Sequence, residues 1–113
     1  MESHAATRQA GKAAIVDLSG SITIAGGTGL LRNKINELVS AGHTNILLNL
    51  RDIKYLDSAG MGELVGVCTT LRNLGGDLKL VSPQERIRNL LEVTKLATIF
   101  SIYADEAAAL GSL

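Results

Sequence analysis

The segment NILLNL, residues 45–50, constrains the fold of this chain more than any other part of the sequence. It is short, apolar and flanked by polar residues, which is typical of a strand buried on both faces of a parallel sheet. Two parallel strands cannot be joined by a tight turn and need a crossover connection, usually a helix. The segment therefore predicts a sheet with helices packed against it.

Helical patterns on both sides of this strand support that prediction. Residues 30–42 place apolar side chains at helical spacing and end at Gly42, which suits the position after a helix terminus. Residues 59–76 show a second apolar helical face and end on two glycines. Further strands are expected at 13–20, 77–82 and 97–104, and further helices after Ser82, with a Ser82–Glu85 capping box, and after Asp105.

This order of elements is an alternation of strands and helices, which predicts an α/β fold. We expect one domain over residues 1–113, in which residues 1–12 form a flexible tail or an edge strand. Hydrophobic residues make up 46% of the chain and aromatic residues only 3%, so the core must be largely aliphatic.

Charge and composition argue against several classes of function. Eleven basic residues balance eleven acidic ones without a basic cluster, so we expect no nucleic-acid partner. Cys68, the single cysteine, cannot form an internal disulfide and is expected in the core, and no metal-binding spacing occurs. No apolar run approaches the length of a membrane helix. We therefore expect a cytoplasmic protein without membrane insertion, metal, cofactor or small-molecule substrate.

The glycines of AGGTGLLRN resemble a nucleotide-binding loop only weakly. The pattern Gly27-x-Gly29 has Arg32 where a third glycine would stand, and no Gly-Lys-Ser/Thr follows. A flexible turn that leads into a helix explains this segment better. Because we find no recognisable catalytic motif either, we do not expect an enzyme.

The stretch YLDSAGMG, residues 55–62, leaves two interpretations open. Asp57 can cap a helix that begins near Ser58, which would be a purely structural role. Gly60 and Gly62, however, each cost about 0.5 to 1 kcal/mol relative to alanine inside a helix. They would permit the close approach of another backbone or a ligand. Ser58 would also follow the carboxyl end of a parallel strand, where α/β proteins bind ligands and partners.

The segment NILLNLRDIKYLDSAGMGELV, together with LRNLGGDLKLVSPQERIRNLLEVTKL, resembles the STAS family, which sulfate transporters and bacterial anti-sigma-factor antagonists share. Its motif is an apolar strand, a short linker, and D-S-[ST]-G-[LM]-G opening a helix. The resemblance covers nearly the whole chain. It implies a single STAS-like domain with a mostly four-stranded mixed sheet and helices packed on one side.

The same resemblance implies a stand-alone bacterial switch protein. Ser58 would be phosphorylated by a serine kinase that is also an anti-sigma factor, and a serine phosphatase would reverse the modification. The unmodified protein would bind the kinase and free the sigma factor. The implied partner surface is Thr23, Ile24, Gly26, Gly27, Asp57, Ser58, Ala59, Gly60, Met61 and Gly62.

Three positions depart from the family pattern. Ala59 replaces a second hydroxyl residue, Thr23 stands where phosphorylatable members carry an acid, and Lys95 replaces a turn glycine. Thr23 favours an alternative function: a STAS scaffold in a sensory complex, or an accessory subunit of a lipid-transport ATPase, that is not phosphorylated. The intact Ser58 favours the phosphorylated antagonist.

Overall fold

A computed structural model of the chain describes residues 3–113. A five-stranded sheet has the strand order β1-β2-β3-β4-β5, in which β1 pairs antiparallel with β2 and the other pairs are parallel. In chain order the elements are β1 (His4–Ala10), β2 (Ala13–Ile22), α1 (Thr28–Ser40), β3 (Asn45–Leu56), α2 (Ser58–Asn73), β4 (Asp77–Val81), α3 (Glu85–Val93), a 3-10 turn (Leu96–Thr98), β5 (Ser101–Tyr103) and α4 (Glu106–Gly111).

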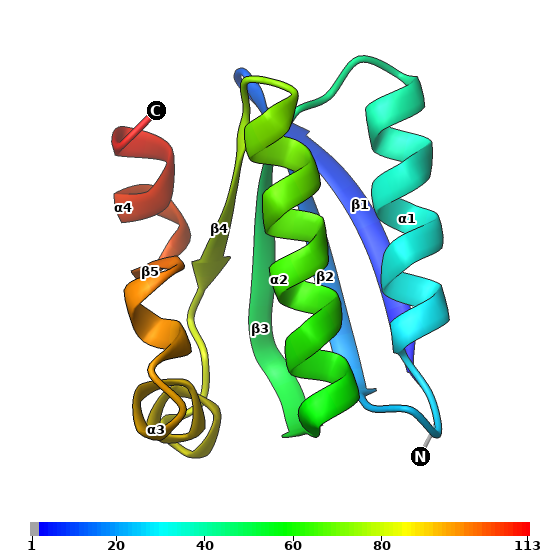
Figure 1. The fold of residues 1–113 in the computed structure, drawn as a ribbon. Coiled ribbons are helices and arrows are strands. Elements are labelled where there is room, and N and C mark those ends of the chain that lie inside the picture. The colour runs from blue at the N-terminus through cyan, green and yellow to red at the C-terminus, as the bar shows by residue number, and fades with distance from the viewer. Residues whose placement is uncertain (1–2) are drawn as a thin grey trace.

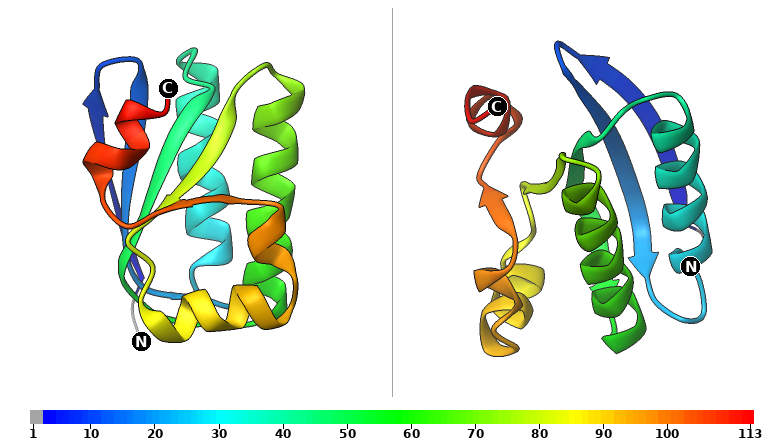
Figure 2. Two further views of the ribbon diagram at one scale, coloured as in Figure 1. Left: turned by 90° about the vertical axis from the view of Figure 1, so that its left-hand side faces the viewer. Right: turned by 45° about the horizontal axis from the view of Figure 1, so that its top comes forward.

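This architecture confirms the predicted α/β class with a mixed sheet. The sheet has five strands, whereas the resemblance implied about four, because residues 4–10 pair along β2 as an edge strand. α1 and α2 lie side by side on one face, and α3 crosses the end of the sheet where β3 finishes (Figures 1 and 2). α4 lies on the opposite face, so the helices are not all on one side.

The alternation of buried side chains along the strands explains these two faces. Val16, Leu48 and Leu80 point into the large aliphatic core beneath α1, α2 and α3. Their neighbours Ile15 and Leu47 point the other way, into a smaller cluster with Ala109 of α4. Each fully buried aliphatic side chain contributes about 1.5 to 3 kcal/mol. The segment 45–50 is thus buried on both faces, as its composition predicts.

β3 is twice as long as the predicted strand. It continues through residues 51–56, where Ile53 and Leu56 are buried and the chain still pairs with β2 through two register shifts. β4 ends opposite Asn49, seven residues and about 23 Å before the end of β3 at 3.3 Å per residue. Only the carboxyl ends of β2 and β3 therefore meet, at the pairs of Ser21 with Tyr55 and Ile22 with Leu56.

Two other local predictions fail for tertiary reasons. Ser82 does not cap α3, because it adopts a positive φ of 54° and donates a hydrogen bond from its hydroxyl to the carbonyl of Ala104. α3 begins at Glu85 after Gln84, without a side-chain cap. The expected strand at 97–104 is split into the 3-10 turn and the short β5.

Candidate functional site

Ser58 is the first residue of α2, and its side chain is exposed. The preceding residue, Asp57, has extended backbone geometry, and its Oδ1 accepts a hydrogen bond from the backbone N–H of Gly60 at 2.8 Å. This is the N-cap that the sequence predicts. The cap leaves the Ser58 hydroxyl at the surface, where a partner or a modifying enzyme can reach it.

Asp57 also connects α2 to a second loop. Its Oδ2 accepts a hydrogen bond from the backbone N–H of Ile24 at 3.0 Å, and its own N–H donates to the carbonyl of Ile22 at 3.4 Å. The hydrogen bonds from the N–H groups of Ile24 and Gly60 lower the pKa of the Asp57 carboxyl below its ordinary value. The ionised carboxylate thereby holds the loop between β2 and α1 beside Ser58.

The two glycines of the motif have different roles. Gly60 is buried, and a Cβ at this position would lie 1.8 Å from the carbonyl oxygen of Ile22. Only glycine permits this approach of α2 to the end of β2, which is the close backbone contact that the motif suggests. Gly62 is exposed, and a Cβ there would meet nothing within 4 Å among the described residues. Gly62 therefore has no packing requirement for glycine.

The loop of residues 23–27 contains the other predicted site residues. Thr23 and Gly26 exchange backbone hydrogen bonds of 2.8 and 3.1 Å, which close a tight turn with the exposed Ile24 at its tip. Gly27 has a φ of 98°, and a Cβ there would lie 2.0 Å from the carbonyl of Ser21. Gly27 and Gly60 thus allow close packing against the end of β2. Thr23, Ile24 and Gly26 lie in the adjoining turn.

The structure brings the predicted residues of the loop and of α2 together at one end of the sheet. It also adds residues that sequence reasoning missed. Tyr55 is 50% exposed, Ile24 82% and Val93 79%, and exposed large apolar side chains that gather in one area mark interaction sites. Met61 belongs to the same area, because its Sδ lies 3.9 Å from the Thr94 hydroxyl just after Val93.

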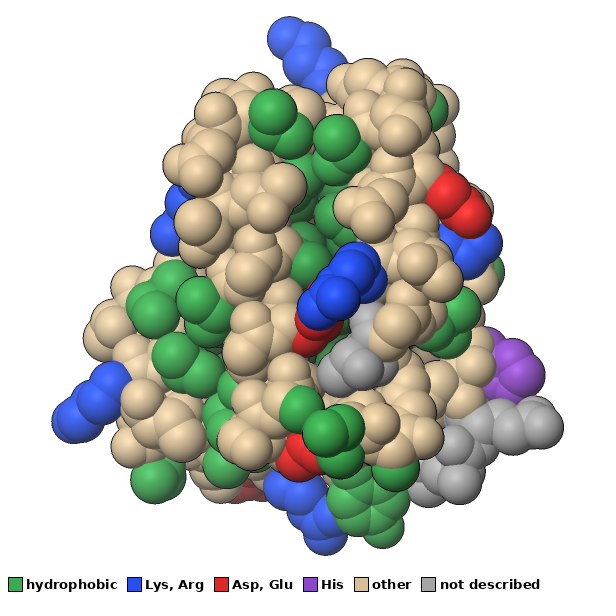
Figure 3. All heavy atoms as spheres, turned by 45° about the vertical axis from the view of Figure 1, so that its right-hand side comes forward, with side chains coloured by type: hydrophobic (Ala, Val, Ile, Leu, Met, Phe, Trp, Pro, Cys, Tyr) green, Lys and Arg blue, Asp and Glu red, His purple; other side chains and the backbone are tan. Residues whose placement is uncertain are grey.

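We call Ile24, Tyr55, Ser58, Met61 and Val93 the Ser58 surface. A hollow of about 370 Å³ beside it is lined by Thr23, Lys54, Tyr55, Leu56, Asp57, Arg86, Ile87 and Leu90. The Arg86 guanidinium lies 5.7 Å from the centre of the Tyr55 ring, within cation–π range. Hydrophobic side chains gather at this end of the molecule in Figure 3. In the sequence, the one sign of this apolar area is the aromatic residue Tyr55, two positions before Asp57.

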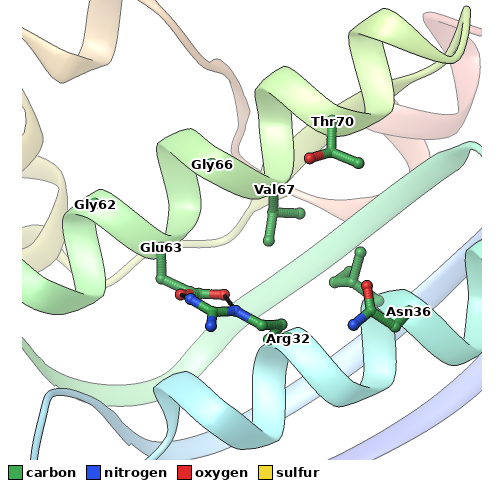
Figure 4. Close-up of a pocket in the computed structure, with 8 residues that line it drawn as sticks. Arg32, Asn36, Gly62, Glu63, Gly66, Val67 and Thr70 are labelled. Carbon is green, nitrogen blue, oxygen red and sulfur yellow. Dashed lines mark hydrogen bonds and ion pairs between the residues drawn. The ribbon is translucent and has the colours of Figure 1, made fainter.

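A second hollow of about 270 Å³ lies between α1 and α2 (Figure 4). We call it the α1–α2 groove, and it is lined by Arg32, Ile35, Asn36, Gly62, Glu63, Gly66, Val67 and Thr70. Arg32 forms a two-pronged ion pair with Glu63, with Nε to Oε1 at 2.9 Å and a second bond from Nη2 to Oε2. The groove begins one helical turn beyond Ser58.

The described residues show few features that would support other chemistry. Within residues 3–113 no group of three or more His, Cys, Asp or Glu side chains could hold a metal ion. Cys68 is buried among aliphatic side chains, as predicted, and burial raises the pKa of its thiol. No helix in this part of the chain is long and apolar enough to cross a membrane.

Comparison with known proteins is consistent with this geometry. The anti-sigma-B factor antagonist of Bacillus subtilis is 34% identical over 89 residues, which span 79% of this chain and 80% of the relative. A Thermotoga neapolitana homologue of the protein TM1081 is 37% identical over 68 residues, and that match spans 60% of the length of each chain. The crystal structure of TM1081 from Thermotoga maritima superposes with a TM-score of 0.88 at 25% identity, covering 96% of this chain and 92% of that one.

The family model for the STAS domain matches residues 4–109, which contain all five strands of the sheet. The curated relatives include antagonists of anti-sigma-B and anti-sigma-F factors. The chain therefore belongs to the STAS domain family and is similar to its bacterial anti-sigma factor antagonists.

Proposed function

We propose that this protein is an anti-sigma-factor antagonist that is switched off by phosphorylation of Ser58. In the unmodified state it binds an anti-sigma factor that is also a serine kinase, and so releases the sigma factor. A serine phosphatase restores the binding state. The observation that carries this proposal is an exposed hydroxyl at Ser58, at the end of the sheet that also carries the exposed Ile24, Tyr55 and Val93 and the half-buried Met61.

The composition of the Ser58 surface supports a protein partner. Exposed aromatic and aliphatic side chains that surround a polar centre are typical of the buried part of a protein–protein interface. The hollow beside Tyr55 is open and mostly apolar, which suits an inserted side chain of a partner. We infer that the partner contacts residues of the 23–27 turn, the start of α2 and the hollow beside it: Thr23, Ile24, Gly26, Tyr55, Asp57, Ser58, Ala59, Met61, Gly62 and Leu90. Gly27 and Gly60 contribute by allowing the close packing of the backbone beneath this surface.

Electrostatics explains how phosphorylation would act. A phosphoryl group adds about −1.5 to −2 charges and three acceptor oxygens at neutral pH. The free N–H groups at the start of α2 tolerate this charge, so the fold need not change. Next to the ionised Asp57, however, the phosphate concentrates negative charge in the middle of the Ser58 surface. A partner fitted to a neutral hydroxyl would lose a few kcal/mol, which is about a hundredfold or more in affinity.

Intact-mass spectrometry tests the proposed phosphorylation. The wild-type protein, the Ser58→Ala variant and a control, Ser40→Ala at the exposed end of α1, are incubated with ATP and a candidate kinase from the same genome. We expect one phosphoryl group on the wild type and on the control, and none on Ser58→Ala. Modification of Ser58→Ala would place the acceptor elsewhere.

Thr23, in a position where phosphorylatable members carry an acid, favours a second function. The protein would then be an unphosphorylated STAS scaffold or an accessory subunit of a lipid-transport ATPase, and Ser58 would be part of a helix cap. Measurable binding to the cognate kinase without any phosphorylation would favour this second function over the first.

A further inference from the structure

The hollow beside Tyr55, which we call the Tyr55 hollow, lies between the end of β3 and one face of α3. The buried Leu56 and Ile87 line it, together with the half-buried Leu90. Arg86 also lines it, because residues four apart, such as Arg86 and Leu90, share one face of a helix. Its volume of about 370 Å³ is near the lower limit of ligand pockets, which span about 300 to 1,000 Å³. A hollow of this size and composition suits one large apolar side chain of a protein partner.

The charged side chains at the Tyr55 hollow are mostly positive. Among the described residues, those that line it are Lys54, Arg86 and Asp57. Lys54 and Arg86 are exposed, and the Arg86 guanidinium lies 5.7 Å from the centre of the Tyr55 ring, which places its charge beside the apolar lining. The Asp57 carboxylate already accepts hydrogen bonds from two backbone N–H groups, one on each oxygen. The hollow therefore combines apolar surface with two exposed cations.

This positive charge is a local feature of the hollow. The chain as a whole has eleven basic and eleven acidic residues. Arg88, two positions after Arg86 on α3, does not line the hollow and forms an ion pair with Glu92 at 3.8 Å. The excess of positive charge thus belongs to Lys54 and Arg86, and Arg88 offers a matched control on the same helix.

We propose that the Tyr55 hollow binds an acidic segment of the anti-sigma factor. One large apolar side chain of that segment enters the hollow, and a neighbouring Asp or Glu of the segment pairs with Lys54 and Arg86. This inference rests on the proposed antagonist function and names the chemistry of the partner. Carboxylate and guanidinium form charge-assisted hydrogen bonds, which strengthen where an apolar interface excludes water. Tyrosine and arginine are also the residue types that most often dominate binding energy at protein interfaces.

An acidic partner segment would account for the direction of the proposed switch. Thr23, which lines the same hollow, carries no charge that would repel a carboxylate. Phosphorylation of Ser58, however, would add negative charge at the residue that directly follows Asp57. Repulsion between this charge and the acidic segment would weaken the complex.

Charge reversal tests the sign of the partner's charge. Isothermal titration calorimetry with the cognate anti-sigma factor compares the wild type, Lys54→Glu, Arg86→Glu and the control Arg88→Glu, which changes the net charge equally outside the hollow. We expect affinity to fall by about tenfold or more in Lys54→Glu and Arg86→Glu, and by less than about threefold in Arg88→Glu. Proton–nitrogen spectra check that each variant is folded.

A second pair of variants tests the apolar part of the contact. Tyr55 is 50% exposed and Leu74 is 51% exposed, but Leu74 lies at the opposite end of α2 from Ser58. In the same titration we expect Tyr55→Ala to weaken binding by about tenfold and Leu74→Ala to leave it unchanged. Equal affinities of these two variants would overturn the insertion of an apolar side chain.

Unchanged or tighter binding of either hollow variant, Lys54→Glu or Arg86→Glu, would overturn the acidic segment. So would an equal loss in Arg86→Glu and Arg88→Glu. These results would leave the antagonist function standing, because the wild type still binds the anti-sigma factor. A wild type that binds no cognate anti-sigma factor would overturn the proposed function and this inference together. The two failures are therefore distinguishable.

Discussion

The N-termini of α2 and α4 begin with the same local motif and use it for different purposes. Asp57 and Asp105 both cap their helices by accepting a hydrogen bond of 2.8 Å from the backbone N–H three residues later. At α4, the next residue is Glu106, which carries a fixed negative charge and pairs with Arg8 of β1 at 2.6 Å. This start of α4 secures the helix against the edge of the sheet.

At α2 the corresponding residue is the uncharged and exposed Ser58, and the third residue is the buried Gly60 where α4 has the exposed Ala108. The second carboxylate oxygen of Asp57 accepts a hydrogen bond from the N–H of Ile24. Among the described residues, the Asp105 carboxylate accepts a backbone hydrogen bond only from Ala108. The difference shows that Asp57 joins the start of α2 to the loop of residues 23–27, so that the two segments form one surface. The cap explains Asp57, but it does not explain Ser58, Gly60 or the exposed apolar neighbours.

The largest effect is expected from Gly60→Ala. The new Cβ would lie 1.8 Å from the Ile22 carbonyl, so α2 must move away from β2, and we expect a loss of about 3 kcal/mol or more in the free energy of unfolding. Urea unfolding measures it. The matched change at α4, Ala108→Gly, should cost only about 1 kcal/mol. Equal losses in the two variants would contradict the close approach at Gly60.

A smaller effect is expected from removing the caps. Asp105→Ala should lower the free energy of unfolding by about 1 kcal/mol. Asp57→Ala should lower it further, because the N–H of Ile24 loses its partner as well as that of Gly60. Hydrogen exchange resolves the difference: the Ile24 amide should exchange about tenfold faster in Asp57→Ala than in the wild type. An unchanged Ile24 amide would show that Asp57 does not hold the loop.

The pH dependence follows from the lowered pKa of Asp57. A carboxyl with a lower pKa in the folded state stabilises the fold above its unfolded pKa of about 3.9, and this contribution is lost as the pH falls through the folded pKa. Urea unfolding of the wild type should therefore weaken more between pH 5 and pH 3 than that of Asp57→Ala. The lowered pKa of Asp17, held by Arg8, contributes equally to both proteins and cancels in the comparison. Parallel pH profiles of the two proteins would contradict this assignment.

The smallest effect is expected from Gly62→Ala. The new Cβ would meet nothing within 4 Å among the described residues, so the better helix propensity of alanine should stabilise the protein by about 0.5 to 1 kcal/mol. Thermal or urea unfolding provides the measurement. Destabilisation would show that Gly62 has a packing role after all. Stabilisation combined with weaker partner binding would instead place Gly62 in the interface.

The sequence predicts those features that depend on short-range chemistry. The buried strand at 45–50, the Asp57 cap and the glycine after α1, which has a φ of 92° at Gly42, all follow from local patterns. Lys95, which stands where the family pattern has a turn glycine, adopts a φ of 66°. In each case the residues that determine the conformation are neighbours in the sequence.

Features that depend on distant contacts could not be predicted in this way. The extension of β3 to Leu56 is stabilised by pairing with β2, and Ser82 is drawn from the helix cap to the carbonyl of Ala104. The bond from Asp57 to Ile24 and the pair of Arg32 with Glu63 join residues more than 30 positions apart. For the candidate site, the motif therefore points to Ser58, whereas only the structure places Tyr55 and Leu90 in the hollow beside Asp57.

The most direct test of the account is the affinity of the cognate anti-sigma kinase for three forms of this protein. Isothermal titration calorimetry compares the unmodified wild type, the protein with phosphoserine at position 58, and Ser58→Ala. We predict tight binding of the wild type and of Ser58→Ala, and a loss of about a hundredfold or more for the phosphorylated form. Affinities of the three forms within about threefold of one another would contradict the claim that the charge on Ser58 controls partner binding.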